Sequence, residues 1–151
     1  MEQTYTEKAP GTSLSAVDVG LLVLRVGIGI VFILHGYPKI AGGPEVWGAI
    51  GGAMTNLGID FAPVFWGFMA ALAEFGGGIL LIFGLFTRIA SILLTITMIV
   101  ATVKLHADGV NFSTLAHPLK MAVVFLALTF SGPGRLSLRQ AASGLRNRWY
   151  C

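Results

Sequence analysis

Two charged residues lie inside long apolar stretches of this sequence and are the first candidates for chemistry. Glu74 is the only charged residue between positions 62 and 86, and Arg25 lies within the apolar stretch 19–37. A carboxylate can accept a proton or hold a ligand, and a guanidinium can neutralise it. Charge inside an apolar segment is costly, so we expect both side chains to face the interior of a helix bundle.

We expect Arg25 to be the partner of Glu74. Counting ~1.5 Å per residue from the predicted helix ends puts the two side chains at depths that long side chains can bridge. Arg25 shares its face with Gly29 and Gly36, and small residues let helices approach closely. The small residues on the Glu74 face are Gly67, Ala70, Gly77 and Gly78. The pair is either a structural ion pair that fixes helix register or a proton-accepting or ligand-binding carboxylate.

A second group of candidates lies at the opposite ends of the apolar stretches. Its members are His35, Lys39, Lys104, His106, His117 and Lys120. We expect the three histidines of the chain to lie at one membrane level, with a polar stripe of Ser91, Thr95, Met98 and Thr102 leading to His106. No two histidines have i, i+4 spacing, so we predict no metal site. Imidazole and cationic donors together favour an outward pocket for a polar or anionic head group, such as a quinone ring.

The composition places these residues in a membrane. The chain has 151 residues, enough for one domain, with 55% apolar and 11% charged residues. Ordinary soluble proteins carry about 25% charged residues, and the mean hydropathy here is +0.79. A soluble domain of this size could not bury so much apolar surface. A cytosolic enzyme, a disordered chain and a collagen-like repeat are therefore excluded.

The net charge of +3 does not indicate nucleic-acid binding, because the basic residues gather at one end. The last 17 residues contain Arg135, Arg139, Arg146 and Arg148. Such a cluster after an apolar chain is typical of a cytoplasmic membrane flank. The single cysteine, Cys151, rules out an intrachain disulfide and a Cys-x-x-Cys redox pair.

Four charge-poor stretches predict four transmembrane helices. They cover residues 19–37, 62–86, 88–106 and 115–131. Each is close to the ~20 residues that cross a bilayer core, and backbone groups in lipid must be satisfied within the segment. We therefore predict an all-α integral membrane four-helix bundle that contacts the lipid bilayer.

The connecting segments and flanks complete this prediction. The Gly-rich connection 38–61 is expected to hold a short interfacial helix near residues 46–57, with Trp47 as its membrane anchor. The tight turn 84–88 makes its two helices an antiparallel pair. Basic flanks predict both termini in the cytoplasm. The expected organisation is a flexible N-terminus (1–17), a transmembrane domain (18–134) and a basic cytoplasmic tail (135–151).

Five short motifs occur in a fixed order between residues 19 and 138. They are Leu24-Arg25, His35-Gly36-x-x-Lys39, Glu74-x-x-Gly77-Gly78, Gly84-Leu85-Phe86-Thr87-Arg88 and Gly132-Pro133-Gly134-Arg135. In this order the sequence resembles the DoxX family of small bacterial membrane proteins. The resemblance implies a four-helix protein of the bacterial inner membrane and carries over Arg25, His35, Lys39, Glu74 and Arg88 as pattern residues. It also implies a redox setting, since some relatives are subunits of a thiosulfate:quinone oxidoreductase and another is associated with an oxidative-stress complex.

The resemblance and the residues together favour a membrane subunit of a redox system that binds quinone. Glu74 and His35 are the predicted proton-exchanging, catalytic residues. The predicted ligand-binding residues are Arg25, Lys39, Lys104, His106 and His117. Because the sequence has no redox-active side-chain motif, electrons would come from a soluble or membrane partner or from a bound cofactor.

Two other functions stay open. The first is a small proton-coupled transporter acting as a homodimer, with Glu74 as its titrating carboxylate. The second is a membrane scaffold that anchors a soluble enzyme through the basic tail and has no chemistry of its own.

Overall fold

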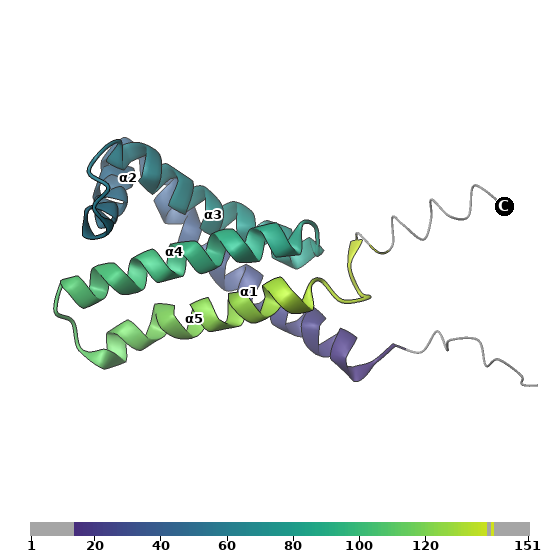
Figure 1. Ribbon diagram of the computed structural model, residues 1–151. Coiled ribbons are helices and arrows are strands. Elements are labelled where there is room, and N and C mark those ends of the chain that lie inside the picture. Colours follow the sequence, from purple (N-terminus) through teal and green to yellow (C-terminus); the bar gives the residue numbers. More distant parts are fainter. Residues whose placement is uncertain (1–13, 139, 141–151) are drawn as a thin grey trace, which may run out of the picture.

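The structure, a computed structural model, describes residues 14–138 and 140, and these residues form helices and short connections without a strand. The helices are α1 (Ala16–Ala41), α2 (Gly43–Gly51), the 3-10 helix η1 (Gly52–Leu57), α3 (Pro63–Phe83), α4 (Thr87–Ala107) and α5 (Phe112–Ser131) (Figure 1). Helices α1, α3, α4 and α5 are long and apolar enough to cross a membrane. The predicted all-α membrane bundle is therefore confirmed. The expected flexible N-terminus lies almost wholly outside the described residues.

Helix α1 is longer at both ends than the apolar stretch 19–37 predicted. Its start is fixed by a capping box, in which the Ser15 hydroxyl accepts from the Val17 amide at 3.2 Å and the Asp18 carboxylate accepts from the Ser15 amide at 3.2 Å. Its end passes Pro38 and reaches Ala41. Proline inside a helix removes a backbone donor, so contacts from outside the helix must support this last turn.

Two local signals set the other helix ends. Gly84 and Phe86 adopt left-handed backbone conformations, with φ of 68° and 47°, and reverse the chain between α3 and α4. The predicted tight turn is confirmed. Helix α5 begins at Phe112, earlier than the predicted position 115, because the Asn111 side chain caps it by accepting from the Thr114 amide at 3.1 Å.

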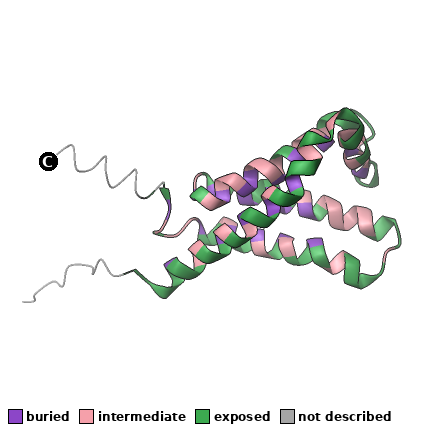
Figure 2. Ribbon diagram, turned by 180° about the vertical axis from the view of Figure 1, so that it is seen from behind, coloured by how far each residue is buried: buried purple, intermediate pink, exposed green. Residues whose placement is uncertain are grey.

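Helix α3 is central to the packing, since it contacts α1, α2 and α4, while α5 packs along α4 (Figure 1). The apolar core consists of Phe32, Leu81, Ala90, Leu94, Met98, Ala122, Phe125 and Leu128. The ring of Phe32 meets that of Phe125 edge-on at 4.8 Å and links α1 to α5. Figure 2 shows buried residues on the facing sides of the helices and exposed residues on their outer sides. The exposed outer faces are those that would contact lipid.

Glycines bring α1 and α3 into backbone contact, as their spacing predicted. A Cβ atom added at Gly36 would lie 2.5 Å from the Phe75 backbone nitrogen, and one at Gly29 would lie 2.7 Å from the Gly78 carbonyl oxygen. A Cβ added at Gly78 would in turn lie 2.8 Å from the Gly29 carbonyl oxygen. No other residue type fits this seam without moving a helix.

The connection between α1 and α3 contains the predicted short helix, which begins at Gly43 and continues into η1. It packs tightly on α3, because a Cβ atom at either Gly51 or Gly67 would overlap the facing backbone. The Trp47 ring lies against Phe68 with ring centroids 4.8 Å apart. Trp47 therefore joins α2 to α3, and its expected use as a membrane anchor stays a prediction.

The seam gives a direct test. Changing Gly36→Ala forces α1 and α3 apart and should lower the free energy of unfolding by about 1–3 kcal/mol. Gly27→Ala is the matched control, since a Cβ at Gly27 meets nothing within 4 Å. The measurement is reversible unfolding of the purified protein in mixed detergent micelles. Equal stability of the two variants would contradict the close approach described here.

Candidate functional site

Glu74 lies in the middle of α3 and forms an ion pair with Lys39 of α1. The Lys39 Nζ donates to both carboxylate oxygens, at 2.7 Å to Oε1 and 2.6 Å to Oε2. The Glu74 side chain is 4% exposed and the Lys39 side chain 33% exposed. The carboxylate is thus enclosed in the bundle, and the pair is reached from outside on the lysine side.

Several contacts hold Lys39 in this position. The indole N–H of Trp47 donates to the Lys39 carbonyl at 2.9 Å and supports the turn of α1 that follows Pro38. Tyr37, two residues earlier, contacts the ring of Phe75 with centroids 6.4 Å apart. Trp47 and the Tyr37–Phe75 contact therefore pack the last turns of α1 against α2 and α3.

Arg25 is fully buried and has different partners from those expected. Its Nη1 donates to the Leu81 carbonyl at 3.2 Å, and its Nη2 donates to the Leu136 carbonyl at 2.6 Å. Leu81 belongs to the last turn of α3, where carbonyls lack helical partners and the helix dipole is negative. The guanidinium charge is thus stabilised by a helix C-terminus and backbone oxygens.

The predicted Arg25–Glu74 pair is wrong, because helix register separates the two residues. Gly36 faces Phe75 across the seam, so Arg25 lies 11 positions, or about 16 Å along α1, from the level of Glu74. The prediction assumed that the two helices start at a common plane. Instead, the first turns of α1 extend beyond the end of α3 and pack against the segment after α5.

The segment after α5 is tied to α1 by two polar contacts. Arg25 binds the Leu136 carbonyl, and the buried Asp18 accepts from the Arg135 amide at 2.9 Å through Oδ1. Residues 135–138 of the predicted cytoplasmic tail therefore pack on the bundle, and nearly all the rest of that tail lies outside the described residues. The sequence reasoning missed Asp18, although its position three residues after Ser15 marks a capping box.

The remaining candidate residues do not gather into one pocket. His35 is exposed on α1, and its Nδ1 donates to the Val31 carbonyl at 3.1 Å. Lys104 pairs with Asp108 at 2.8 Å on the surface, and His106 and His117 are exposed. Within residues 14–138 and 140, no three His, Cys, Asp or Glu side chains could jointly hold a metal ion.

The expected common membrane level of the three histidines stays a prediction. The predicted stripe on α4 does face inward at Ser91 and Thr95. The Thr95 hydroxyl donates to the Ser91 carbonyl of its own helix at 2.7 Å.

Comparison with known proteins gives the family of this bundle. The DoxX family profile matches residues 20–107, which include Arg25, Lys39 and Glu74. This chain belongs to the DoxX family. The match covers α3 and α4 completely and most of α1, so the ion pair lies within the matched region.

Three relatives of this DoxX protein match over most of their lengths. The putative oxidoreductase CatD of Bacillus subtilis is 35% identical over 76% of this chain and 81% of its own. The Escherichia coli inner membrane protein YqjF is 31% identical over 87% and 96% of the two chains. The inner membrane protein YphA of the same organism is 30% identical over 82% and 91%. No solved structure matches this chain.

The Lys39–Glu74 pair predicts a strong energetic coupling. Lys39→Met leaves a buried carboxylate unpaired and should cost about 3–5 kcal/mol of unfolding free energy. The double variant Lys39→Met with Glu74→Gln should recover a large part of that loss, which a double-mutant cycle in micelles measures. The cycle with Arg25→Gln and Glu74→Gln should be additive. Coupling in that second cycle, and its absence in the first, would restore the pairing that the sequence suggested.

Changing Arg25 should have a different effect from changing Lys39. Arg25→Met removes two hydrogen bonds and leaves the Leu136 carbonyl without its partner, so the segment after α5 should detach more often. We expect limited trypsin digestion at Arg135 to become several times faster. Lys120→Met, which changes an exposed lysine on α5, should leave that rate unchanged. Equal rates for wild type and Arg25→Met would show that Arg25 does not hold this segment.

Proposed function

We propose that this DoxX protein is a membrane subunit of a redox system in the bacterial inner membrane and binds a quinone beside the Lys39–Glu74 pair. Four apolar helices support the membrane location. The names of the relatives support the inner-membrane location and the redox role, since two are called inner membrane proteins and one a putative oxidoreductase.

The ion pair is the observation that carries the proposal. An ammonium group has three N–H donors, and two of them bind Glu74. The third is free to donate to a ligand carbonyl from the exposed side of Lys39. Glu74 would then hold or release a proton next to that carbonyl. This arrangement fits a ligand that is apolar, lives in the bilayer and carries carbonyl oxygens.

The residues around the pair fit such a ligand. The Trp47 indole binds the Lys39 carbonyl, and aromatic rings bind flat apolar molecules well. A bound quinone would supply two-electron redox chemistry coupled to proton uptake and release. The sequence contains one cysteine, Cys151, and no Cys-x-x-Cys pair. Electrons would therefore come from a partner protein or from a bound cofactor.

The other predicted residues take secondary places in this proposal. His35 lies one helical turn before Lys39 on α1 and would carry protons between Glu74 and the surface. Arg25 binds backbone carbonyls, so we assign it a positioning role instead of ligand binding. Ligand binding by Lys104, His106 and His117 at the helix ends stays a prediction.

The orientation is also part of the proposal. One end of the bundle holds the start of α1 and the α3–α4 turn. Its described residues include Arg25, Arg88 and Arg135. The two terminal segments add Lys8, Arg139, Arg146 and Arg148 to that side. The opposite ends of the spanning helices carry Lys39, Lys104 and Lys120. By the positive-inside rule, the arginine end and both termini face the cytoplasm.

Quinone binding is tested with purified protein in lipid nanodiscs titrated with decylubiquinone. Bound quinone should quench tryptophan fluorescence and be retained in native mass spectra. Lys39→Met should weaken binding about tenfold or more, since a charge-assisted hydrogen bond is lost. Lys120→Met, an exposed lysine on α5, is the control and should bind as the wild type does.

Two outcomes would overturn this function. If wild type and Lys39→Met bind quinone with equal affinity, the ion pair is not part of the quinone site. If protein without bound quinone still complements a deletion strain, quinone binding is not part of the function. Proton-coupled uptake into vesicles that is lost in Glu74→Gln would support the transporter alternative.

A further inference from the structure

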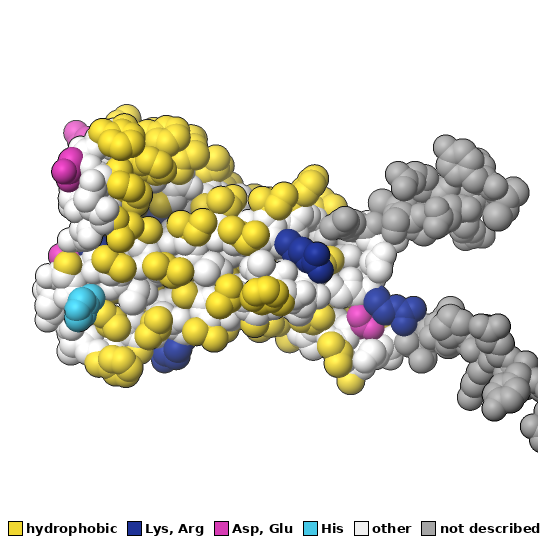
Figure 3. Space-filling view, viewed as in Figure 1, with side chains coloured by type: hydrophobic (Ala, Val, Ile, Leu, Met, Phe, Trp, Pro, Cys, Tyr) yellow, Lys and Arg dark blue, Asp and Glu magenta, His cyan; other side chains and the backbone are white. Residues whose placement is uncertain are grey.

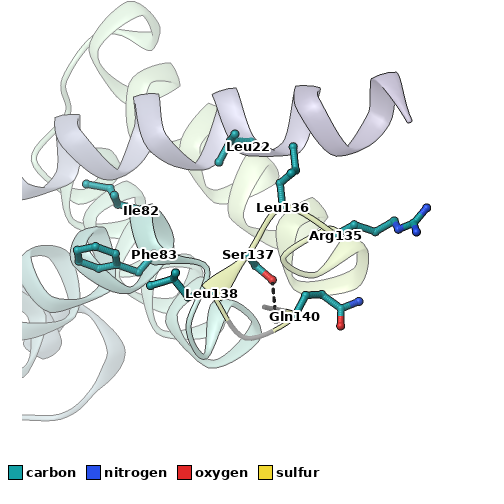
Figure 4. A pocket seen from close by; sticks show the side chains of 8 residues that line it. All are labelled: Leu22, Ile82, Phe83, Arg135, Leu136, Ser137, Leu138 and Gln140. Atoms are coloured by element: carbon teal, nitrogen blue, oxygen red, sulfur yellow. Dashed lines mark hydrogen bonds between the residues drawn. The ribbon is translucent and has the colours of Figure 1, made fainter. Parts of the chain in front are cut away.

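A groove lies at the arginine end of the bundle, far from the Lys39–Glu74 pair. It is formed by the first half of α1, the end of α3, residues 135–138 and Gln140 (Figure 4). Its inner wall is apolar and consists of Leu22, Ile82, Phe83, Leu136 and Leu138. Phe83 and Leu138 are each about half exposed, at 50% and 51%. The wall therefore offers open apolar surface at the point where α3 ends.

Two polar residues of the groove, Arg135 and Gln140, lie at its outer rim. Arg135 is exposed, and Figure 4 shows its side chain extending away from the apolar residues. Gln140 is exposed as well, and its backbone amide donates to the hydroxyl of the buried Ser137 at 3.4 Å. From the bundle outward, the groove thus changes from apolar to basic over the length of a few residues.

Charge at this end favours an anion. The buried guanidinium of Arg25 lies directly behind the groove wall, bound to the Leu136 carbonyl. Arg88 lies next to Gly132 on the same end, and Figure 3 shows basic side chains there. Among the residues that the structure describes, the acid nearest to this end is Asp18, whose two carboxylate oxygens each accept a backbone N–H, from Arg135 and from Ser15. Its negative charge is thereby partly compensated.

We propose that this groove binds one anionic phospholipid. The phosphate lies against Arg135 at the rim, and an acyl chain lies along Leu22, Ile82 and Phe83. The spanning helices α1 and α3 begin and end here, so the groove opens where the head groups of one leaflet lie. A soluble anion would use the basic rim and leave the apolar wall uncovered. A phospholipid matches both halves of the groove.

The test uses full-length, delipidated protein in non-ionic detergent and native mass spectrometry. The protein is mixed with equal amounts of phosphatidylglycerol and phosphatidylcholine that carry the same acyl chains. Wild type should retain one phosphatidylglycerol in preference to phosphatidylcholine. Arg135→Gln should reduce this preference about fivefold, as expected for one basic side chain near a head group. Arg135→Lys should keep most of it.

Lys120→Gln is the matched control, because it removes an exposed positive charge at the other end of the bundle. It should leave the preference unchanged. Leu138→Asn should weaken retention of both lipids, and added inorganic phosphate should displace neither. An equal loss in Lys120→Gln and Arg135→Gln, or an unaltered preference in Arg135→Gln, would overturn the proposal. Displacement by inorganic phosphate would instead show a site for the free anion.

Discussion

The close contact between α1 and α3 is the constraint on which the rest of this structure depends. Gly29, Gly36 and Gly78 let the two backbones touch, and touching backbones cannot slide past each other without steric overlap. In lipid, where burial of apolar surface gives little drive for helices to associate, such close packing supplies much of the attraction. The seam therefore fixes which residue of α1 faces which residue of α3.

Once this register is set, the two buried charges receive different partners. Glu74 lies opposite the last turns of α1 and is bound by the ammonium of Lys39. Arg25 lies opposite the end of α3 and is bound by carbonyl oxygens. Carbonyls at a helix end accept hydrogen bonds from a guanidinium in a fixed geometry, so this charge serves to position chain segments. The ion pair, with one partner partly exposed, is the group that a ligand can reach.

The ends of the bundle are chemically distinct as a consequence. One end combines a packed short helix, aromatic rings and the lysine–glutamate pair. The other combines arginines with the segment that follows α5 and an apolar groove. This separation would let the proposed quinone site and the proposed lipid site coexist in a small chain without sharing residues. Helix α1 links the two ends, because it supplies Lys39 to one end and Arg25 to the other.

The sequence alone determined the fold class, the four spans, the tight turn at Gly84 and the inward orientation of Glu74. These follow from composition, from helical periodicity and from the cost of exposed polar groups in lipid, all of which are local properties of the chain. The partners of Glu74 and Arg25 were decided only by tertiary structure. Their pairing depends on the relative axial position of two helices, which a shift of a few residues changes completely. Helical periodicity shows which face the glycines occupy. It does not show which residue of α3 each glycine of α1 meets, or that Asp18 and Leu136 hold the end of the chain.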